Sequence, residues 1–279
     1  MLEIKVKNPG AELESIKFNG KEMLHDGKTF WNRQAPILFP TVGRLKENKT
    51  IIEGKNYEIP QHGFAKDLEF KLIEDKENYK KYMLKSNEKT LEMYPYEFEL
   101  YVEYEIKDNT LTVKYNVINK NERDMIFGIG GHPGFKIDES QDKYYFELEK
   151  EEKNAIFMEV EGNYISKKPA KNILKDNKII NIEKDSFIND AIMMKNLKSK
   201  KITLKKKENK KEILEFNFGN FPILAIWSIP GAQYICLEPW FNYADKVEET
   251  GYFKDKEGVI TLKPNKEFMS QFSVKFFKE

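Results

Sequence analysis

The sequence predicts an all-β protein, a large antiparallel β-sandwich, and three observations support this fold class. Apolar and polar residues alternate with a period of two over most of the chain, as in strands that bury one face. Helical periodicity is scarce, and there is no strand–helix–strand rhythm and no long internal repeat. No linker rich in Gly, Ser or Pro divides the chain, so we expect residues 1–279 to form a single domain.

The clearest pair of strands lies in the segment ELYVEYEIKDNTLTVKYNVIN. Its apolar residues alternate with polar ones on both sides of the polar turn KDNT, which predicts an antiparallel hairpin. The buried faces carry Leu100, Val102, Tyr104 and Ile106 before the turn and Leu111, Val113, Tyr115 and Val117 after it.

Further strands follow from the same pattern. TIIEGKNYEIP alternates around Gly54, and GVITLKPNKEFMSQFSVKFF alternates around a turn at residues 264–265. EILEFNFGNFPILAIWSIP and QYICLEPW add strands, and the second is apolar enough to lie inside the protein. One turn of helix is expected at residues 186–190, and no longer helix is predicted.

Composition excludes several classes of partner. Lys and Arg number 47 against 46 Asp and Glu, so the net charge of +1 gives no general attraction to nucleic acid or acidic membranes. Only Arg33, Arg44 and Arg123 are arginines, and the lysine runs are interpreted as coding bias rather than as a binding face. The single Cys236 excludes an intrachain disulfide and a cysteine-ligated metal cluster, and its apolar neighbours predict an inert buried thiol.

The N-terminus and the hydropathy pattern predict a soluble cytoplasmic protein. MLEIKVKNPG lacks a basic leader followed by an apolar stretch, and no window approaches the ~18 apolar residues of a membrane span. The oligomeric state stays open, because exposed sheet edges could pair between copies or be covered.

Reactive side chains stand at places where glycine or proline interrupts the alternation. They are Arg44 in FPTVGRL, His62 in PQHGFAKDLEF, His132 in GIGGHPGF and Glu238 in CLEPW. Taken alone, Arg44 is also explained as a solvated or salt-bridged surface residue. His62 is also explained as a turn residue that hydrogen-bonds the backbone.

His132 lies in a constrained stretch of backbone. Gly130 and Gly131 permit backbone angles that other residues avoid, and Pro133 biases residue 132 toward an extended conformation. Together they would hold the imidazole in a defined direction, although a tight structural turn would use the same residues.

Glu238 stands in an apolar strand, between Leu237 and Pro239. Burial there would raise the pKa of its carboxyl and make it a competent base near neutral pH. The alternative is a structural ion pair with an Arg or Lys. Asp190 in FINDAIMM also has two interpretations, as a capping residue or as a carboxylate of the site.

A carboxylate base and an imidazole acid suit proton transfers to and from oxygen atoms. Trp227, Trp240 and Phe64 lie near these segments, and aromatic rings stack on the C–H faces of sugars, although core packing also explains them. A zinc enzyme would need clustered His, Cys or carboxylate ligands, and neither HExxH nor a Cys pair is present. A serine hydrolase would need a GxSxG elbow, which is absent.

Five motifs in order resemble the aldose 1-epimerase (galactose mutarotase) family, particularly its LacX-like branch. They are FPTVGRL, QHGFAKDLEF, GGHPGF, FINDAIMM and LAIWSIPGAQYICLEPW. The resemblance begins near GAELESIKFNGKEML and covers essentially the whole chain. It implies a galactose mutarotase-like β-supersandwich with an open sugar-binding cleft across one sheet.

The resemblance also implies a reaction and a role for each residue. Glu238 would take the proton of the C1 hydroxyl while His132 protonates the ring oxygen, so that the ring opens and recloses as the other anomer. His62 would assist at the ring oxygen or a neighbouring hydroxyl, and Arg44 and Asp190 would hold sugar hydroxyls. The glycines before His132 would leave room for the sugar. No redox change occurs, so neither a cofactor nor a metal is expected.

Two departures from the family bear on the substrate. HPGF and VGRL replace the longer motifs of the best-studied mutarotases, so no sugar contacts carry over beyond the residues named. Lys66 stands where the hexose-6-phosphate branch often has an arginine that clamps phosphate, which favours a free hexose or pentose. Lys66 and Arg33 keep a hexose-6-phosphate 1-epimerase open as an alternative. A non-catalytic sugar-binding protein is another, and the presence of both His132 and Glu238 argues against it.

Overall fold

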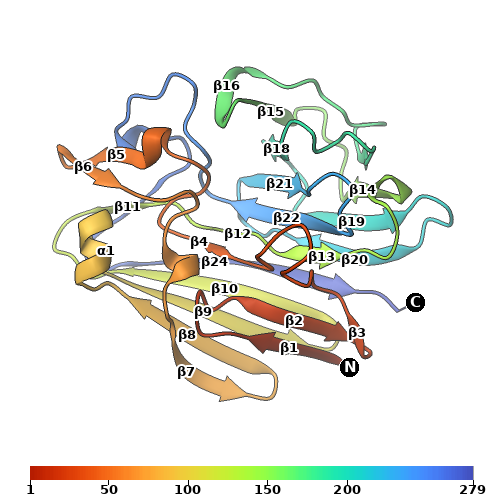
Figure 1. Cartoon of the computed structure of the whole chain (residues 1–279), viewed down its shortest axis with the longest axis horizontal. Coiled ribbons are helices and arrows are strands. Elements are labelled where there is room, and N and C mark those ends of the chain that lie inside the picture. The colour runs from red at the N-terminus through yellow and green to blue at the C-terminus, as the bar shows by residue number, and fades with distance from the viewer. Residues whose placement is uncertain (279) are drawn as a thin grey trace.

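Two antiparallel sheets pack against each other in the computed structural model, which describes residues 1–278 (Figure 1). The nine-stranded sheet consists, in spatial order, of β17 (Ile179–Asn181), β14 (Tyr144–Leu148), β19 (Lys201–Lys206), β20 (Glu212–Asn217), β24 (Glu267–Phe276), β10 (Thr110–Asn119), β9 (Phe98–Lys107), β8 (Tyr79–Lys85) and β7 (Lys71–Lys76). The eight-stranded sheet consists of β16 (Tyr164–Pro169), β15 (Ile156–Glu161), β18 (Ile192–Lys195), β21 (Ile223–Trp227), β22 (Tyr234–Trp240), β12 (Gly130–Gly131) and β4 (Ile37–Leu38), with β13 (Gly134–Lys136) also paired to β22. The predicted all-β antiparallel sandwich is confirmed.

Smaller sheets lie around this sandwich. They are β1 (Leu2–Val6) with β2 (Leu13–Phe18) and β3 (Lys21–Glu22), β5 (Lys49–Ile52) with β6 (Lys55–Glu58), and β11 (Met125–Phe127) with β23 (Ile260–Leu262). Short 3₁₀ helices are η1 (Lys46–Asn48), η2 (Ala65–Asp67), η3 (Gln141–Lys143) and η4 (Phe253–Asp255).

The α-helical content differs from the prediction. The helix α1 (Glu88–Met93) was not predicted, although Asn87 and Thr90 form a capping box at its start. The helical turn expected at residues 186–190 is instead a run of turns, in which the amide of Ser186 donates to Glu183 and that of Asp190 to Phe187. Within residues 1–278, no helix is long and apolar enough to cross a bilayer.

The predicted hairpins are confirmed where the turn is tight. Lys107 pairs with Thr110 across a two-residue turn between β9 and β10, and Ile52 pairs with Lys55 between β5 and β6. The alternation on both sides of residues 264–265 has a different origin, because β23 pairs with β11 while β24 lies in the nine-stranded sheet. A period of two shows that each segment is a strand, but it does not show which strand each one pairs with.

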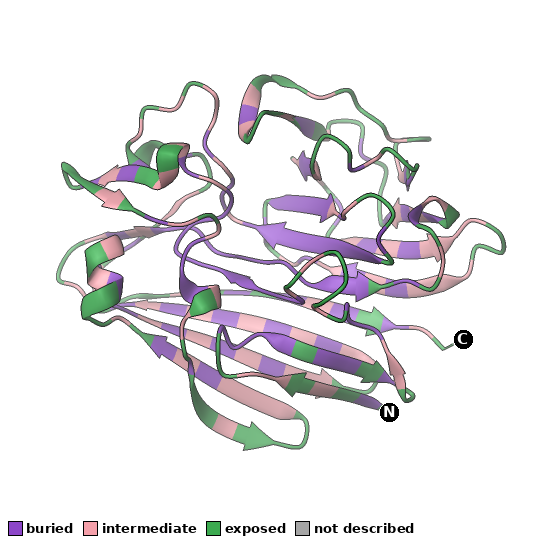
Figure 2. Cartoon of the chain, viewed as in Figure 1, coloured by how far each residue is buried: buried purple, intermediate pink, exposed green. Residues whose placement is uncertain are grey.

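β22 is buried along its whole length, because both faces of the eight-stranded sheet are covered (Figure 2). Ile235 and Leu237 face the core shared with the nine-stranded sheet. Cys236, Glu238 and Trp240 alternate with them and face the other way, toward a cavity and the loops around it. We call this second side of the eight-stranded sheet its outer face.

Candidate active site

A cavity of about 910 Å³ opens on the outer face of the eight-stranded sheet. Loops far apart in the sequence surround it, so the cavity forms only when the chain folds. Most of the predicted site residues line it: Arg44, His62, Lys66, His132, Asp190, Trp227 and Glu238. A volume of this order accommodates a small-molecule ligand.

His132 leaves the sheet where the backbone pairing along β22 is interrupted. The amides of Leu237 and Phe241 donate to carbonyls on the two sides of His132, at residues 133 and 129. Pro239, between them on the same edge of β22, has no N–H to donate. The chain can therefore turn out of the sheet at His132, between β12 and β13, without leaving an amide of β22 unpaired.

Gly130 and Gly131, which precede His132, allow neighbouring side chains to pack closely against the backbone. Gly130 and Gly131 do not adopt left-handed backbone angles. A Cβ on Gly131 would lie 2.9 Å from the ring of Phe272 in β24, and one on Gly130 would lie 2.8 Å from the ring of Trp240. Protein atoms fill the space next to both residues, so the expectation that they leave room for a sugar is wrong.

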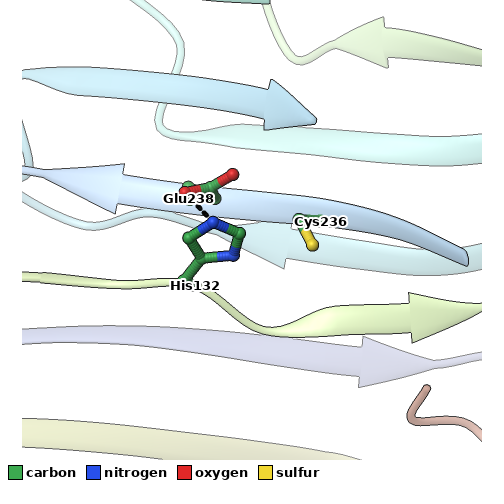
Figure 3. Close-up of side chains that lie close together, drawn as sticks. All are labelled: His132, Cys236 and Glu238. Carbon is green, nitrogen blue, oxygen red and sulfur yellow. Dashed lines mark ion pairs between the residues drawn. The ribbon is translucent and has the colours of Figure 1, made fainter. Parts of the chain in front are cut away.

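His132 and Glu238 meet in the cavity, where His132 Nε2 lies 3.0 Å from Glu238 Oε2 (Figure 3). Glu238 is 1% exposed, and burial raises the pKa of its carboxyl, although the adjacent imidazole opposes this shift. Among the described residues, the ion-pair partner of Glu238 is this histidine, and the alternative of a structural ion pair with an Arg or Lys is not observed. Within residues 1–278, His132 Nδ1 has no hydrogen-bond partner, and Glu238 Oε2 has none beyond this contact.

Two tryptophan rings enclose the imidazole of His132. The ring of Trp31 lies 4.8 Å from it in a tilted stack, and the ring of Trp227 lies 5.5 Å away edge to face. His25 Nε2 lies 2.9 Å from the carbonyl oxygen of Trp31, a contact that helps to hold the loop of Trp31 in place. Trp31 was not predicted as a site residue, because its irregular, polar loop carries no periodicity that indicates a place in the site.

His62 is held by an unusual backbone turn. Its φ of 64° places it in the left-handed region, and its Nδ1 accepts a hydrogen bond from the amide of Gly43 at 3.1 Å. Gly63 follows with φ 73°, and a Cβ there would lie 2.0 Å from the carbonyl oxygen of Phe39. Glycine is therefore required at this position, both by the backbone angle and by the close approach.

The electrostatic surroundings keep His62 neutral. Burial lowers the pKa of its imidazole well below the usual value, and the nearby charges of His132, Lys66 and Arg44 lower it further. With Nδ1 accepting from Gly43, the proton of the neutral ring lies on Nε2. His62 therefore offers the cavity a hydrogen-bond donor.

Arg44 sits on a loop that a buried ion pair supports. Its Nη2 donates to Gln61 Oε1 at 2.7 Å, and its carbonyl accepts from the amide of Asp245 at 2.8 Å. Asp245 Oδ2 accepts from the amide of Lys46 at 2.8 Å, and its Oδ1 pairs with the ammonium of Lys256, which is also buried. Asp245 therefore holds the backbone around Arg44 in place without a bound ligand.

Two charged residues lie at the rim. Asp190 is exposed, and its Oδ1 accepts from the amide of Ala191 at 2.7 Å, a local bond that leaves the rest of the carboxylate available. Lys66 Nζ lies 3.0 Å from Asp67 Oδ2, and Arg33 pairs with the same carboxylate. Both cations therefore already have an anionic partner.

Phe64 lies in the core, contrary to the prediction that it contacts a sugar. It is 2% exposed, and its ring packs against those of Phe39, Tyr94 and Phe98. Trp240, which sequence reasoning left between core and site, contributes to both, because it packs in a buried cluster and also lines the cavity.

The comparisons with known proteins agree with this fold. The family model described as aldose 1-epimerase matches residues 1–274. The chromosomal LacX protein of Lactococcus lactis subsp. lactis is 32% identical over 282 residues, which cover 94% of this chain and 92% of that protein. A galactose mutarotase related enzyme from Lactobacillus acidophilus has a TM-score of 0.92 at 31% identity, covering 100% of this chain and 95% of that one. A galactose mutarotase-like protein from Lactobacillus casei ATCC 334 also has a TM-score of 0.92, at 26% identity and with coverages of 99% and 97%. The chain therefore belongs to the aldose 1-epimerase family.

Proposed function

We propose that this protein is an aldose 1-epimerase, an isomerase that interconverts the α and β anomers of a free aldose, and that residues 1–279 act as one domain. The observation that carries the proposal is the distance of 3.0 Å between His132 Nε2 and Glu238 Oε2 inside the cavity. The C1 hydroxyl oxygen and the ring oxygen of a pyranose are bonded to the same carbon. An acid and a base this close together suit simultaneous action on both oxygens.

In the proposed reaction, Glu238 accepts the proton of the C1 hydroxyl while the imidazolium of His132 donates its proton to the ring oxygen. The bond between C1 and the ring oxygen breaks as the C1 carbonyl forms, which gives the open-chain aldehyde. After rotation about C1–C2, His132 takes back the proton as the ring oxygen attacks C1. Glu238 then returns its proton to the new C1 hydroxyl. Every atom and proton returns to the sugar, so the scheme draws on no cofactor.

The remaining residues hold the sugar in this proposal. Neutral His62 donates from Nε2 to the ring oxygen or a neighbouring hydroxyl. Arg44 acts as a multiple donor and Asp190 as an acceptor for further hydroxyls. Trp227 offers an aromatic face to the sugar and, with Trp31, keeps the imidazole of His132 in place.

The pH dependence of anomer exchange should reflect the raised pKa of the buried base, Glu238. Because burial raises the pKa of Glu238 above 4.5, lowering the pH protonates this base sooner than an exposed glutamate. We therefore expect the acid limb of kcat/KM for anomer exchange to have its midpoint above about 4.5. Polarimetry from about pH 4 to pH 8 measures the limb, with circular dichroism over the same range as the control for unfolding. A midpoint at or below the ordinary glutamate value would contradict a base tuned by burial.

A hexose-6-phosphate 1-epimerase is the second candidate, because Lys66 and Arg33 both line the cavity. Their pairing with Asp67 favours a free sugar. We expect Lys66→Ala to change exchange of free sugars by no more than about threefold. A selective loss of about tenfold or more on glucose 6-phosphate would instead favour the phosphosugar. Lys71→Ala, which removes an exposed lysine of β7, is the matched control.

NMR anomer exchange on glucose, galactose, xylose and glucose 6-phosphate tests the proposed function directly. An anomer exchange rate above the spontaneous rate for any of the three free sugars supports the free-aldose epimerase. The sugar with the largest acceleration identifies the preferred class of substrate. A protein that binds one of these sugars but accelerates none of them is a sugar-binding protein with a cleft of the same shape.

A further inference from the structure

Three potential metal ligands meet on the outer face of the eight-stranded sheet. Cys236 and Glu238 are two residues apart on β22, so their side chains leave the same face of the strand. His132 lies beside them at the break between β12 and β13 (Figure 3). One ligand atom from each residue, the Cys236 Sγ among them, lies within 4.8 Å of the other two. No metal was expected from the sequence, because these three residues form neither an HExxH motif nor a Cys pair.

These ligand atoms are buried and partly without partners. His132 is 8% exposed, Glu238 1% and Cys236 0%. Within residues 1–278, His132 Nδ1 has no hydrogen-bond partner, Glu238 Oε2 has none beyond its contact with His132, and the Cys236 thiol is not in a disulfide. A cation bound between these side chains would give the buried carboxylate of Glu238 a positive partner and offset its desolvation penalty.

We propose that His132, Cys236 and Glu238 form a binding site for a zinc-like divalent cation, and that its occupancy inhibits the enzyme. The inhibitory role rests on the proposed function, because the bound cation would occupy His132 and Glu238, the acid and the base of anomer exchange. One imidazole, one thiolate and one carboxylate are ligands that zinc accepts together, with a fourth position left for water or a sugar hydroxyl. His132 and Glu238 line the cavity, so that fourth position faces the open side.

The spacing suits a tetrahedral ion after small movements. Zinc ligands at ~2.0–2.3 Å from the metal stand roughly 3.3–3.6 Å from one another. The His132–Glu238 distance of 3.0 Å would open slightly, and Cys236 would approach from its position within 4.8 Å. Magnesium and calcium do not fit, because they require six or more oxygen ligands and the cluster supplies a single carboxylate.

Charge and protons balance in the bound state. The thiol of Cys236 loses its proton to solvent as the sulfur–metal bond forms, and Glu238 binds as the carboxylate. Two negative ligands and a neutral imidazole neutralise the two positive charges of the cation. The cation would reach the site from the cavity, because His132 and Glu238 line it, whereas Cys236 lies in the buried cluster against which Trp31 and Trp227 pack.

Cobalt(II) tests the site without reference to catalysis. A thiolate bound to Co²⁺ produces a charge-transfer absorption band in the near ultraviolet, and Cys236 is the single cysteine of the chain. We expect the wild-type protein to develop this band with one Co²⁺ per chain and to lose it when Zn²⁺ is added. Cys236→Ser should show no band, and Cys236→Ala serves in its place if the serine variant does not fold.

Inhibition is measured in parallel, with each protein compared with its own metal-free rate of anomer exchange. Zn²⁺ should inhibit the wild type, and Cys236→Ser should require at least about tenfold more Zn²⁺ for the same inhibition. Mg²⁺ is the control cation and should inhibit neither protein. Equal inhibition of the two proteins by Zn²⁺ would overturn the role of Cys236 as a ligand.

Different experimental outcomes would contradict the metal site and the proposed epimerase function. A folded wild-type protein without the cobalt band overturns the metal site, whatever its activity toward sugars. A protein that shows the band but accelerates no sugar retains the metal site and loses the proposed function. Full exchange activity in the Zn²⁺-saturated protein would leave the site in place and overturn its inhibitory role.

Discussion

Glu238→Gln is expected to slow anomer exchange by roughly 10²–10⁴ while the affinity for sugar changes little. Gln has almost the same shape as Glu, so it keeps the packing of β22, but its amide cannot accept the C1 proton. Burial opposes a charged carboxylate at this position, and a neutral amide carries no such penalty, so the variant should remain folded. NMR exchange measures the rate, and calorimetric titration measures sugar affinity.

The matched control is Glu77→Gln, an exposed glutamate in the turn between β7 and β8, which should exchange at the wild-type rate. Wild-type exchange in Glu238→Gln would exclude this carboxylate as the base. Loss of sugar affinity together with the rate would assign Glu238 to binding instead.

His132→Ala is expected to cause a loss of similar size, roughly 10²–10⁴ in the exchange rate. The imidazole is the proposed donor to the ring oxygen, and it acts in the same step as Glu238. The two losses should therefore not add, and the double variant with Glu238→Gln should be little slower than either single variant. Exchange rates of the two single variants and the double variant, measured by NMR, complete this cycle.

Two further variants keep this prediction testable. Because truncation would leave a gap between the rings of Trp31 and Trp227, His132→Gln serves if the alanine variant does not fold. His62→Gln is the comparison, with an expected loss of only about tenfold, because His62 is proposed to donate a hydrogen bond rather than a proton. A larger loss at His62 than at His132 would reverse the two assignments.

Strands with a strong local pattern could be predicted from the sequence. The hairpin of β9 and β10 follows from strict alternation and a two-residue polar turn, both of which act over neighbouring residues. The burial of Glu238 also follows locally, because apolar residues on both sides of it form a strand with two covered faces.

Other features depend on what a segment meets after folding. β23 and β24 alternate as a hairpin would, yet they belong to different sheets. Phe64 stands beside His62 in the sequence, but it faces the core while His62 lines the cavity. Gly131 is needed because the ring of Phe272 approaches its backbone, a contact with a strand near the other end of the chain.

The sequence by itself determined the all-β class and the main hairpins, and it identified seven residues that line the cavity, because side-chain alternation and motif residues are visible locally. Only the tertiary structure decided that His132 meets Glu238, that Trp31 covers the imidazole and that Cys236 lies beside the pair. The positions of Glu238 and Cys236 beside His132 depend on the register between β22 and the segment from β12 to β13. Pairing between distant strands follows from the packing of the whole chain, and no local pattern encodes it.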